Sequence, residues 1–184
     1  MSRFFSNNLY FLLTTIIFSF VALLNVSNAL VFCSFIYVMI IFTANSMSEI
    51  YGQKKTIKAI ILCVLINAAL LWNSKFYINN IDTSVILFGS LLSVLVSTYC
   101  GINVLLRLKP KYDFHVRNFI SLVLCSIIDC FIMSGFLFNK FSTNIVLSKF
   151  TQDMTFKFLY SIVISFGVLL AFYALQQFKN LKKT

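Results

Sequence analysis

The sequence predicts an all-α integral membrane protein, a bundle of about six transmembrane helices with both termini in the cytoplasm. Three observations predict this fold: the composition, the length of the apolar segments and the placement of the basic residues. Of 184 residues, 60% are hydrophobic and 11% are charged, and the mean hydropathy is +0.92. A soluble protein of this size needs far more surface charge, so a soluble fold is excluded.

The apolar segments account for almost the whole chain. A helix needs about 20 apolar residues to cross about 30 Å of hydrocarbon, so the chain holds about six spans and little else. We therefore expect a single transmembrane domain over residues 1–184. One proline and five glycines leave most segments uninterrupted, as expected where each backbone group must be satisfied within its own helix. The expected spans are 9–26, 30–48, 57–72, 84–106, 118–138 and 156–178.

The basic residues indicate the orientation. The formal net charge is +10, and the lysines and arginines lie almost entirely between the expected spans. With the N-terminus inside, eleven of them fall on the cytoplasmic side and four on the outer side. This split follows the positive-inside rule, so the charge reflects topology and not nucleic-acid binding. The cytoplasmic group is Arg3, Lys54, Lys55, Lys58, Arg107, Lys109, Lys111, Arg117, Lys179, Lys182 and Lys183, and the outer group is Lys75, Lys140, Lys149 and Lys157.

The residue types that metal sites and many enzymes require are scarce. The five cysteines lie in apolar segments without paired spacing, and His115 is the only histidine. The segment 51–56 lacks the first glycine of a phosphate-binding loop, because Met47 stands in its place. We therefore expect no metal or other cofactor, no ATP hydrolysis within the chain and no enzymatic activity.

Polar side chains inside the spans are the strongest functional signal, because each is costly in hydrocarbon. Asp129 lies about eleven residues into the expected fifth span, or about 16 Å along the helix, near the bilayer midplane. A polar stripe precedes it on the same helix face, at spacings of three and four: Asn118, Ser121 and Cys125. We expect this face to line a bundle interior or a watery cavity that moves a small polar molecule across the membrane. An aspartate that is only hydrogen-bonded to a neighbouring helix is the alternative.

A second polar cluster ends the second expected span. Asn45 and Glu49 are four residues apart and therefore share a helix face. They could join Asp129 in one acidic pocket, which would suit a ligand that is cationic or rich in N–H donors. Alternatively, Glu49 could simply reach the cytoplasmic interface.

Two basic residues stand at the starts of expected spans. Arg117 begins the fifth span and could meet Glu49 from another helix. Lys157 opens the sixth span from the outer side, an unfavourable place for a cation given the helix dipole. Asp153, four residues earlier, offers Lys157 a surface ion pair, which we weigh equally with a functional role.

These motifs resemble those of the queuosine precursor transporters, also called the vitamin uptake transporter family. The segment 43–52, TANSMSEIYG, is similar to the family's D-x-x-x-E-x-Y-G segment. The segment 117–129 is similar to its R-N…S…ID pattern, and 107–109 fits its R-L-K after the fourth helix. Asn25 and Lys157 fall where the family has an asparagine and a lysine.

The chain departs from the family's pattern at five positions. Asn45 and Gly101 stand where aspartates are usual, Thr98 and Ser126 replace glutamines, and Gly167 replaces a proline. These changes concern the substrate more than the fold, because they remove acids and amides that would bind a base edge.

The resemblance implies uptake of a 7-deazaguanine compound, a precursor or the free base of the tRNA nucleoside queuosine, across the cell inner membrane. Such a ligand has a guanine-like donor edge that a carboxylate can accept, and a flat ring on which aromatic side chains can stack. Tyr37 and Tyr99 are candidates for stacking, with packing as the alternative. The residues that the resemblance and the polar pattern place in substrate binding are Asn25, Asn45, Glu49, Arg117, Ser121, Asp129 and Lys157.

The expected partners are the small-molecule substrate and the lipid bilayer, with no nucleic acid. So small a bundle could also form a homodimer. An ATPase partner is left open, because the substrate-binding subunit of an energy-coupling-factor vitamin importer has a similar length and helix number. A small structural membrane subunit is a further alternative.

Overall fold

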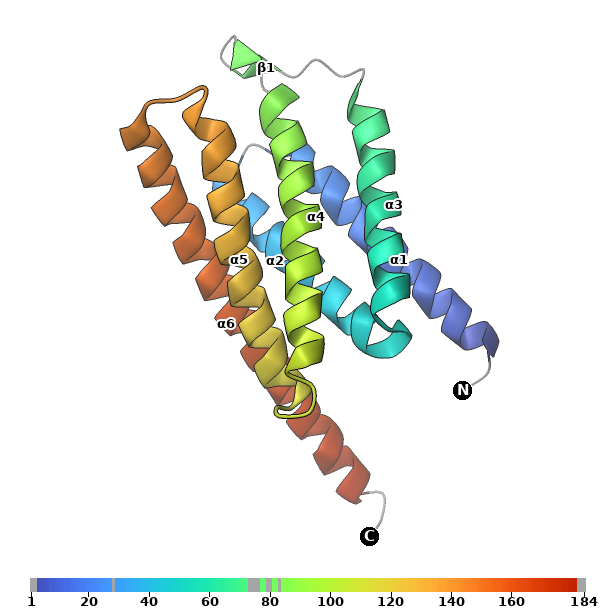
Figure 1. Ribbon diagram of the computed structural model, residues 1–184. Helices are drawn as coiled ribbons and strands as arrows, with labels where there is room; N and C mark the ends of the chain where they lie inside the picture. Colours follow the sequence, from blue (N-terminus) through green and yellow to red (C-terminus); the bar gives the residue numbers. More distant parts are fainter. Residues whose placement is uncertain (1–2, 28, 73–76, 79–80, 83, 182–184) are drawn as a thin grey trace.

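The computed structural model describes residues 3–27, 29–72, 77–78, 81–82 and 84–181. Within these residues six helices pack side by side as a bundle (Figure 1), which confirms the predicted all-α fold class. A hairpin of two very short antiparallel strands joins α3 to α4. The elements are α1 (Arg3–Val26), α2 (Leu30–Tyr51), α3 (Gln53–Trp72), β1 (Tyr77–Ile78), β2 (Ile81–Asp82), α4 (Ser84–Arg107), α5 (Phe114–Phe138) and α6 (Thr143–Leu181).

Most of the helices have the length and apolar composition of membrane-spanning helices. Among the described residues, five helices are long and apolar enough to cross a bilayer, namely α1, α2, α4, α5 and α6. The chain is thus a multi-pass membrane protein. Helix α3 has 20 residues and packs against α1, α2 and α4. Its side chains Leu62 and Leu65 are exposed, as suits contact with lipid, but its role as a sixth span stays a prediction.

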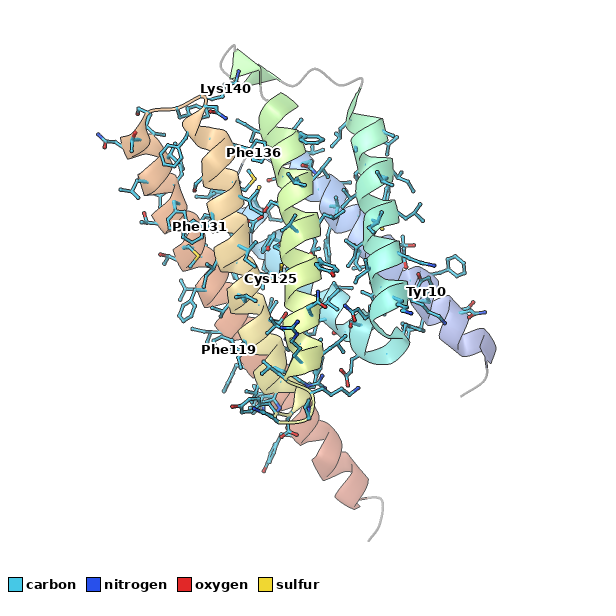
Figure 2. All side chains as sticks on the ribbon, viewed as in Figure 1. Tyr10, Phe119, Cys125, Phe131, Phe136 and Lys140 are labelled. Atoms are coloured by element: carbon cyan, nitrogen blue, oxygen red, sulfur yellow. The ribbon has the colours of Figure 1, made fainter. Side chains whose placement is uncertain are left out.

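The two ends of the bundle differ in charge. Helix α1 begins and α6 ends at the same end of the bundle, where the connections α2–α3 and α4–α5 also lie (Figure 1). Most of the described lysines and arginines are in these connections and the adjoining turns. Lys140 lies at the opposite end, in the α5–α6 connection (Figure 2). We call the basic end the inner end and the other the outer end; the cytoplasmic assignment stays a prediction. Lys75, Lys182 and Lys183 lie outside the described residues.

The predicted start of the sixth helix was wrong. Helix α6 begins at Thr143 and not at residue 156. Hydropathy marks only the apolar part of a helix, whereas α6 continues through a polar segment whose side chains reach solvent or the bundle interior. Lys149 is exposed, whereas Asp153 is partly buried. Lys157 consequently lies about four turns into the helix, and not at its first turn.

Helix α2 is at the centre of the bundle, because it packs against all five other helices. Its buried residues are spread over most of its length, from Ser34 to Ser48. Helices α4 and α5 also approach each other closely at Gly101. A Cβ atom on Gly101 would lie 2.1 Å from Sγ of Cys125 and 2.9 Å from Oγ of Ser121. Small residues permit such close helix packing in membranes.

Candidate functional site

A cavity of about 480 Å³ lies in the outer half of the bundle. Its walls come from the end of α1, the starts of α2 and α4, the second half of α5 and the first half of α6. Most of the lining is apolar. The charged and amide side chains that line it are Asn25, Asp129, Lys149, Asp153 and Lys157.

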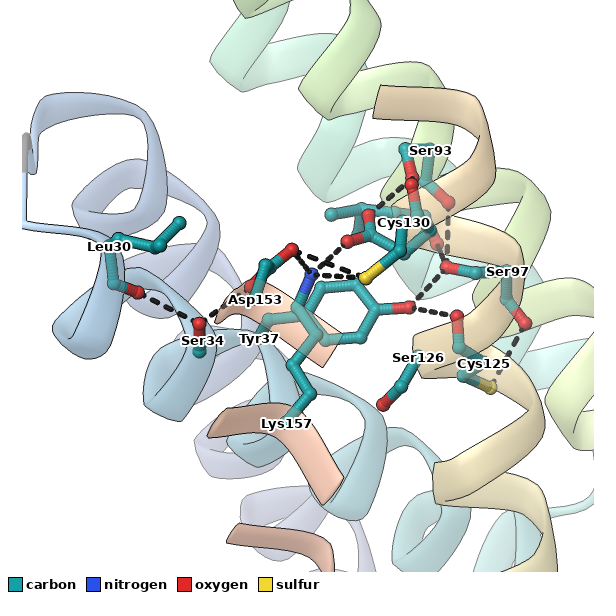
Figure 3. Close-up of polar contacts among 12 residues, drawn as sticks. Leu30, Ser34, Tyr37, Ser93, Ser97, Cys125, Ser126, Cys130, Asp153 and Lys157 are labelled. Carbon is teal, nitrogen blue, oxygen red and sulfur yellow. Dashed lines mark hydrogen bonds and ion pairs between the residues drawn. The ribbon is translucent and has the colours of Figure 1, made fainter. Parts of the chain in front are cut away.

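The cavity wall contains a buried group of three charges, which we call the triad: Asp129, Asp153 and Lys157. The Lys157 ammonium forms ion pairs with both carboxylates. Asp129 and Lys157 are only 4% and 3% exposed. Figure 3 shows Lys157 reaching toward Asp153 beside the ring of Tyr37, whose centroid is 4.5 Å from Nζ. Charges buried to this degree are tolerated only when they are paired and hydrogen-bonded, as these are.

Hydrogen bonds from three helices hold the two carboxylates of the triad. The Ser93 hydroxyl of α4 donates to Oδ1 of Asp129. The Ser34 hydroxyl of α2 donates to Oδ1 of Asp153 at 2.6 Å, and the Cys130 thiol of α5 lies 3.3 Å from Oδ2 of Asp153. Together with Lys157, these donors give every carboxylate oxygen at least one hydrogen bond. The carboxylates therefore have fixed positions at the cavity.

The two carboxylates of the triad and the neighbouring thiol of Cys130 also have the spacing of a metal site. Ligand atoms of Asp129, Cys130 and Asp153 lie within 4.8 Å of one another. However, Nζ of Lys157 bonds to both carboxylates and lies 3.7 Å from the Cys130 sulfur. The cation that these groups hold is therefore the lysine's own ammonium.

Tyr37 forms part of the cavity floor. Its side chain is buried, and its ring packs against the Lys157 ammonium, a cation–π contact. The hydroxyl lies 2.7 Å from Oγ of Ser97 and donates to the carbonyl oxygen of Cys125 at 2.9 Å. Tyr37 thus ties α2 to α4 and α5 just below the triad.

A layer of neutral polar side chains lies further toward the inner end. The Asn45 amide nitrogen of α2 donates to Oδ1 of Asn118 at 2.8 Å and to Oγ of Ser121 at 3.1 Å, both on α5. All three side chains are completely buried. The predicted polar stripe of α5 is therefore confirmed as a buried face.

A group of ion-paired residues lies at the inner end of the bundle. Nη1 of Arg117 donates to Oε2 of Glu49 at 2.8 Å, and Nζ of Lys109 lies 3.1 Å from Oε1 of Glu49. The predicted contact between Arg117 and Glu49 is confirmed. Of the two alternatives for Glu49, the structure favours the one at the inner end, because its carboxylate pairs with these two cations. Glu49 is not among the residues that line the cavity beside Asp129.

The predicted site residues divide into two groups, and their binding role stays a prediction. Those that line the cavity are Asn25, Asp129 and Lys157, and those that lie toward the inner end are Asn45, Glu49, Arg117 and Ser121. The pairing of Asp153 with Lys157 is confirmed, but it is mostly buried and not at the surface. Sequence reasoning missed Asp153 as a cavity residue; its signal was the i, i+4 spacing to Lys157, which required the helix to extend to Thr143.

Comparison with known proteins identifies a family for most of the chain. A family described as "putative vitamin uptake transporter" matches residues 32–175, which include the triad and both inner layers. Neither the curated proteins nor the solved structures contain a match to the chain.

Proposed function

The chain belongs to the vitamin uptake transporter family, and we propose that it imports a 7-deazaguanine compound, a precursor or the free base of queuosine, across the cell inner membrane. The observation that carries this proposal is the triad at the cavity. Asp129 and Asp153 present carboxylate oxygens there, and carboxylates are acceptors only. A guanine-like base has an edge of adjacent N–H donors that such oxygens can bind.

The size and position of the cavity support the same proposal. Small-molecule sites occupy about 300–1,000 Å³, and this cavity, at about 480 Å³, has room for a bicyclic base. It lies in the outer half of the bundle, which is the side from which an imported molecule arrives. Asn25 adds an amide oxygen to the same wall. The inner residues Asn45 and Glu49 would be met later in transport, because they lie below Tyr37.

The test is restoration of queuosine in a bacterium that cannot make its precursors and lacks its own carrier. Cells that express the chain receive the early precursors or the free base queuine at low concentration, and queuosine in tRNA is measured. We expect the wild-type chain to restore it with at least one compound. Asp129→Asn should reduce restoration at least tenfold, because it removes the acceptor charge and preserves the shape of the side chain.

Two controls make the result decisive. Asp113→Asn is the matched control, because it makes the same chemical change in an exposed acid outside the cavity. It should restore queuosine as well as the wild type does. Protein level in the membrane is measured for each variant. Absence of import for every compound, with wild-type protein present in the membrane, would exclude this substrate class; full import by Asp129→Asn would exclude the role of Asp129.

A further inference from the structure

We propose that the cavity takes up one extra positive charge in each transport cycle, carried by a proton or by an ammonium group of the transported molecule. The inference rests on the proposed transport function and defines the charge that must enter with, or as part of, the substrate. Three features of the cavity support it: its charge balance, its unpaired acceptor and its depth in the membrane.

The triad has an excess of negative charge. Its two carboxylates face one ammonium, which leaves one negative charge uncompensated. The other titratable groups beside the triad, among the described residues, are Tyr37 and Cys33 from α2 and Cys130 from α5. All three are neutral in their ordinary protonated forms. The α1 and α4 segments that line the cavity contribute amide and hydroxyl groups but no charge. Lys149 of α6 also lines the cavity, but its side chain is exposed and it forms no ion pair with either carboxylate in the described part of the chain, so the buried triad itself keeps its excess negative charge.

An unpaired acceptor lies in the same cavity. The Asn25 side chain is 8% exposed, and its Nδ2 donates to the carbonyl oxygen of Val21 at 2.7 Å. This bond fixes the orientation of the amide, since the reversed amide would place two oxygens against each other. Oδ1 of Asn25 is consequently buried without a hydrogen-bond partner among the described residues. A buried acceptor left in this state is unfavourable, and a donor that reached it from the cavity would remove that cost.

The excess negative charge and the unpaired amide oxygen indicate which kind of cation the cavity can bind. The cavity offers carboxylate and amide oxygens around an ammonium that is already present, so it suits a further N–H or O–H donor. A proton would bind to an oxygen of Asp129 or Asp153 from the outer water. An ammonium group on the substrate would instead donate to these oxygens and to Asn25 without any proton transfer.

The depth of the triad explains why the charge is required. While the cavity is wet, water stabilises the excess negative charge. When the cavity closes around its contents, an uncompensated charge enters a low-dielectric interior, which is strongly unfavourable. Neutralisation by one cation removes this barrier. Closure, and hence transport, is therefore coupled to the arrival of one positive charge, which is released at the inner side with the substrate.

The test uses purified protein in liposomes without sodium, supplied with 7-deazaguanine bases that do or do not carry an amine. An inside-negative potential of about 100 mV favours inward movement of one positive charge by about 50-fold. We expect this potential to accelerate uptake of both bases. Uptake of the neutral base should also acidify the liposome interior, whereas uptake of the charged amine should not.

Asp153→Asn removes the excess negative charge and should abolish the effect of the potential on the remaining uptake, whereas the exposed Asp113→Asn should keep it. The thermal midpoint of purified protein between pH 8 and pH 6 gives a second readout that needs no substrate. If a proton supplies the charge, the wild type should become more stable relative to Asp153→Asn as the pH falls, because a proton bound only by the folded wild type stabilises it. If the liposomes take up neither base, the proposed substrate class is wrong. The thermal comparison then tests this inference by itself. Uptake that does not respond to the potential, or that needs sodium, overturns the inference. An identical pH response of the two proteins excludes the proton as the charge, and without uptake of either base it overturns the inference too.

Discussion

Lys157 is the residue whose loss should destabilise the fold most. It is the one cation shared by two buried carboxylates, so Lys157→Met leaves Asp129 and Asp153 facing each other without a counterion. Removing one partner of a buried ion pair costs about 3–5 kcal/mol. Asp129→Asn is milder, because Lys157 keeps its pairing with Asp153 and the amide oxygen can still accept. Its expected cost is one charge-assisted hydrogen bond, about 1.5–3 kcal/mol.

The difference is large enough to measure. The two variants should differ by about 2 kcal/mol, or about 4–8 °C in thermal midpoint for a protein of this size. The assay is thermal unfolding of the purified proteins in detergent. The double variant Lys157→Met with Asp129→Asn should recover part of the loss, because it leaves one buried carboxylate where Lys157→Met leaves two. The reasoning is refuted if Lys157→Met is no less stable than Asp129→Asn, or if the double variant is no more stable than Lys157→Met.

Two further predictions concern packing and orientation. Gly101→Ala should destabilise the protein by about 1–3 kcal/mol, because the new methyl group would overlap the sulfur of Cys125; Cys125→Ala in the same chain should recover much of this loss in a thermal unfolding series. For orientation, the native cysteines are first replaced by alanine. A membrane-impermeant thiol reagent applied to intact cells should then label Lys140→Cys but not Lys111→Cys. The opposite labelling would reverse the assignment of inner and outer ends.

The sequence predicted the helices well where hydrophobicity alone determines them. The second and fourth predicted spans begin where α2 and α4 begin, because the apolar segment and the helix coincide there. The prediction failed at α6, whose first turns contain Asn144, Lys149 and Asp153. Local composition marks such a segment as a loop. Only the tertiary structure, with solvent for Lys149 and the triad for Asp153, shows why it is helical.

For the site, too, the sequence predicted features within one helix but not contacts between helices. Spacing along one helix correctly placed Asn118, Ser121 and Asp129 on one buried face, because this needs only helix geometry. The partners of that face come from other helices: Lys157 for Asp129, and Asn45 for Asn118 and Ser121. Nothing in the spacing says which of several buried polar residues will meet. Gly101 is a second example: the resemblance places an aspartate at this position, but any larger side chain there would collide with Ser121 and Cys125 of this chain.

The inner layers must open if a substrate in the cavity is to reach the cytoplasm. Below Tyr37, buried hydrogen bonds join α2 to α5 through Asn45 and Asn118, whose side-chain ends are 2.8 Å apart. Asn45→Cys and Asn118→Cys, introduced together in a chain without native cysteines, can therefore be joined by a short bifunctional thiol reagent. Cross-linking should stop uptake into liposomes. Either cysteine alone, treated identically, should leave the uptake rate as it was before treatment, because a single attachment does not join the helices. Uptake that continues after complete cross-linking would show that α2 and α5 do not separate at this layer, and that the substrate leaves the cavity by another path.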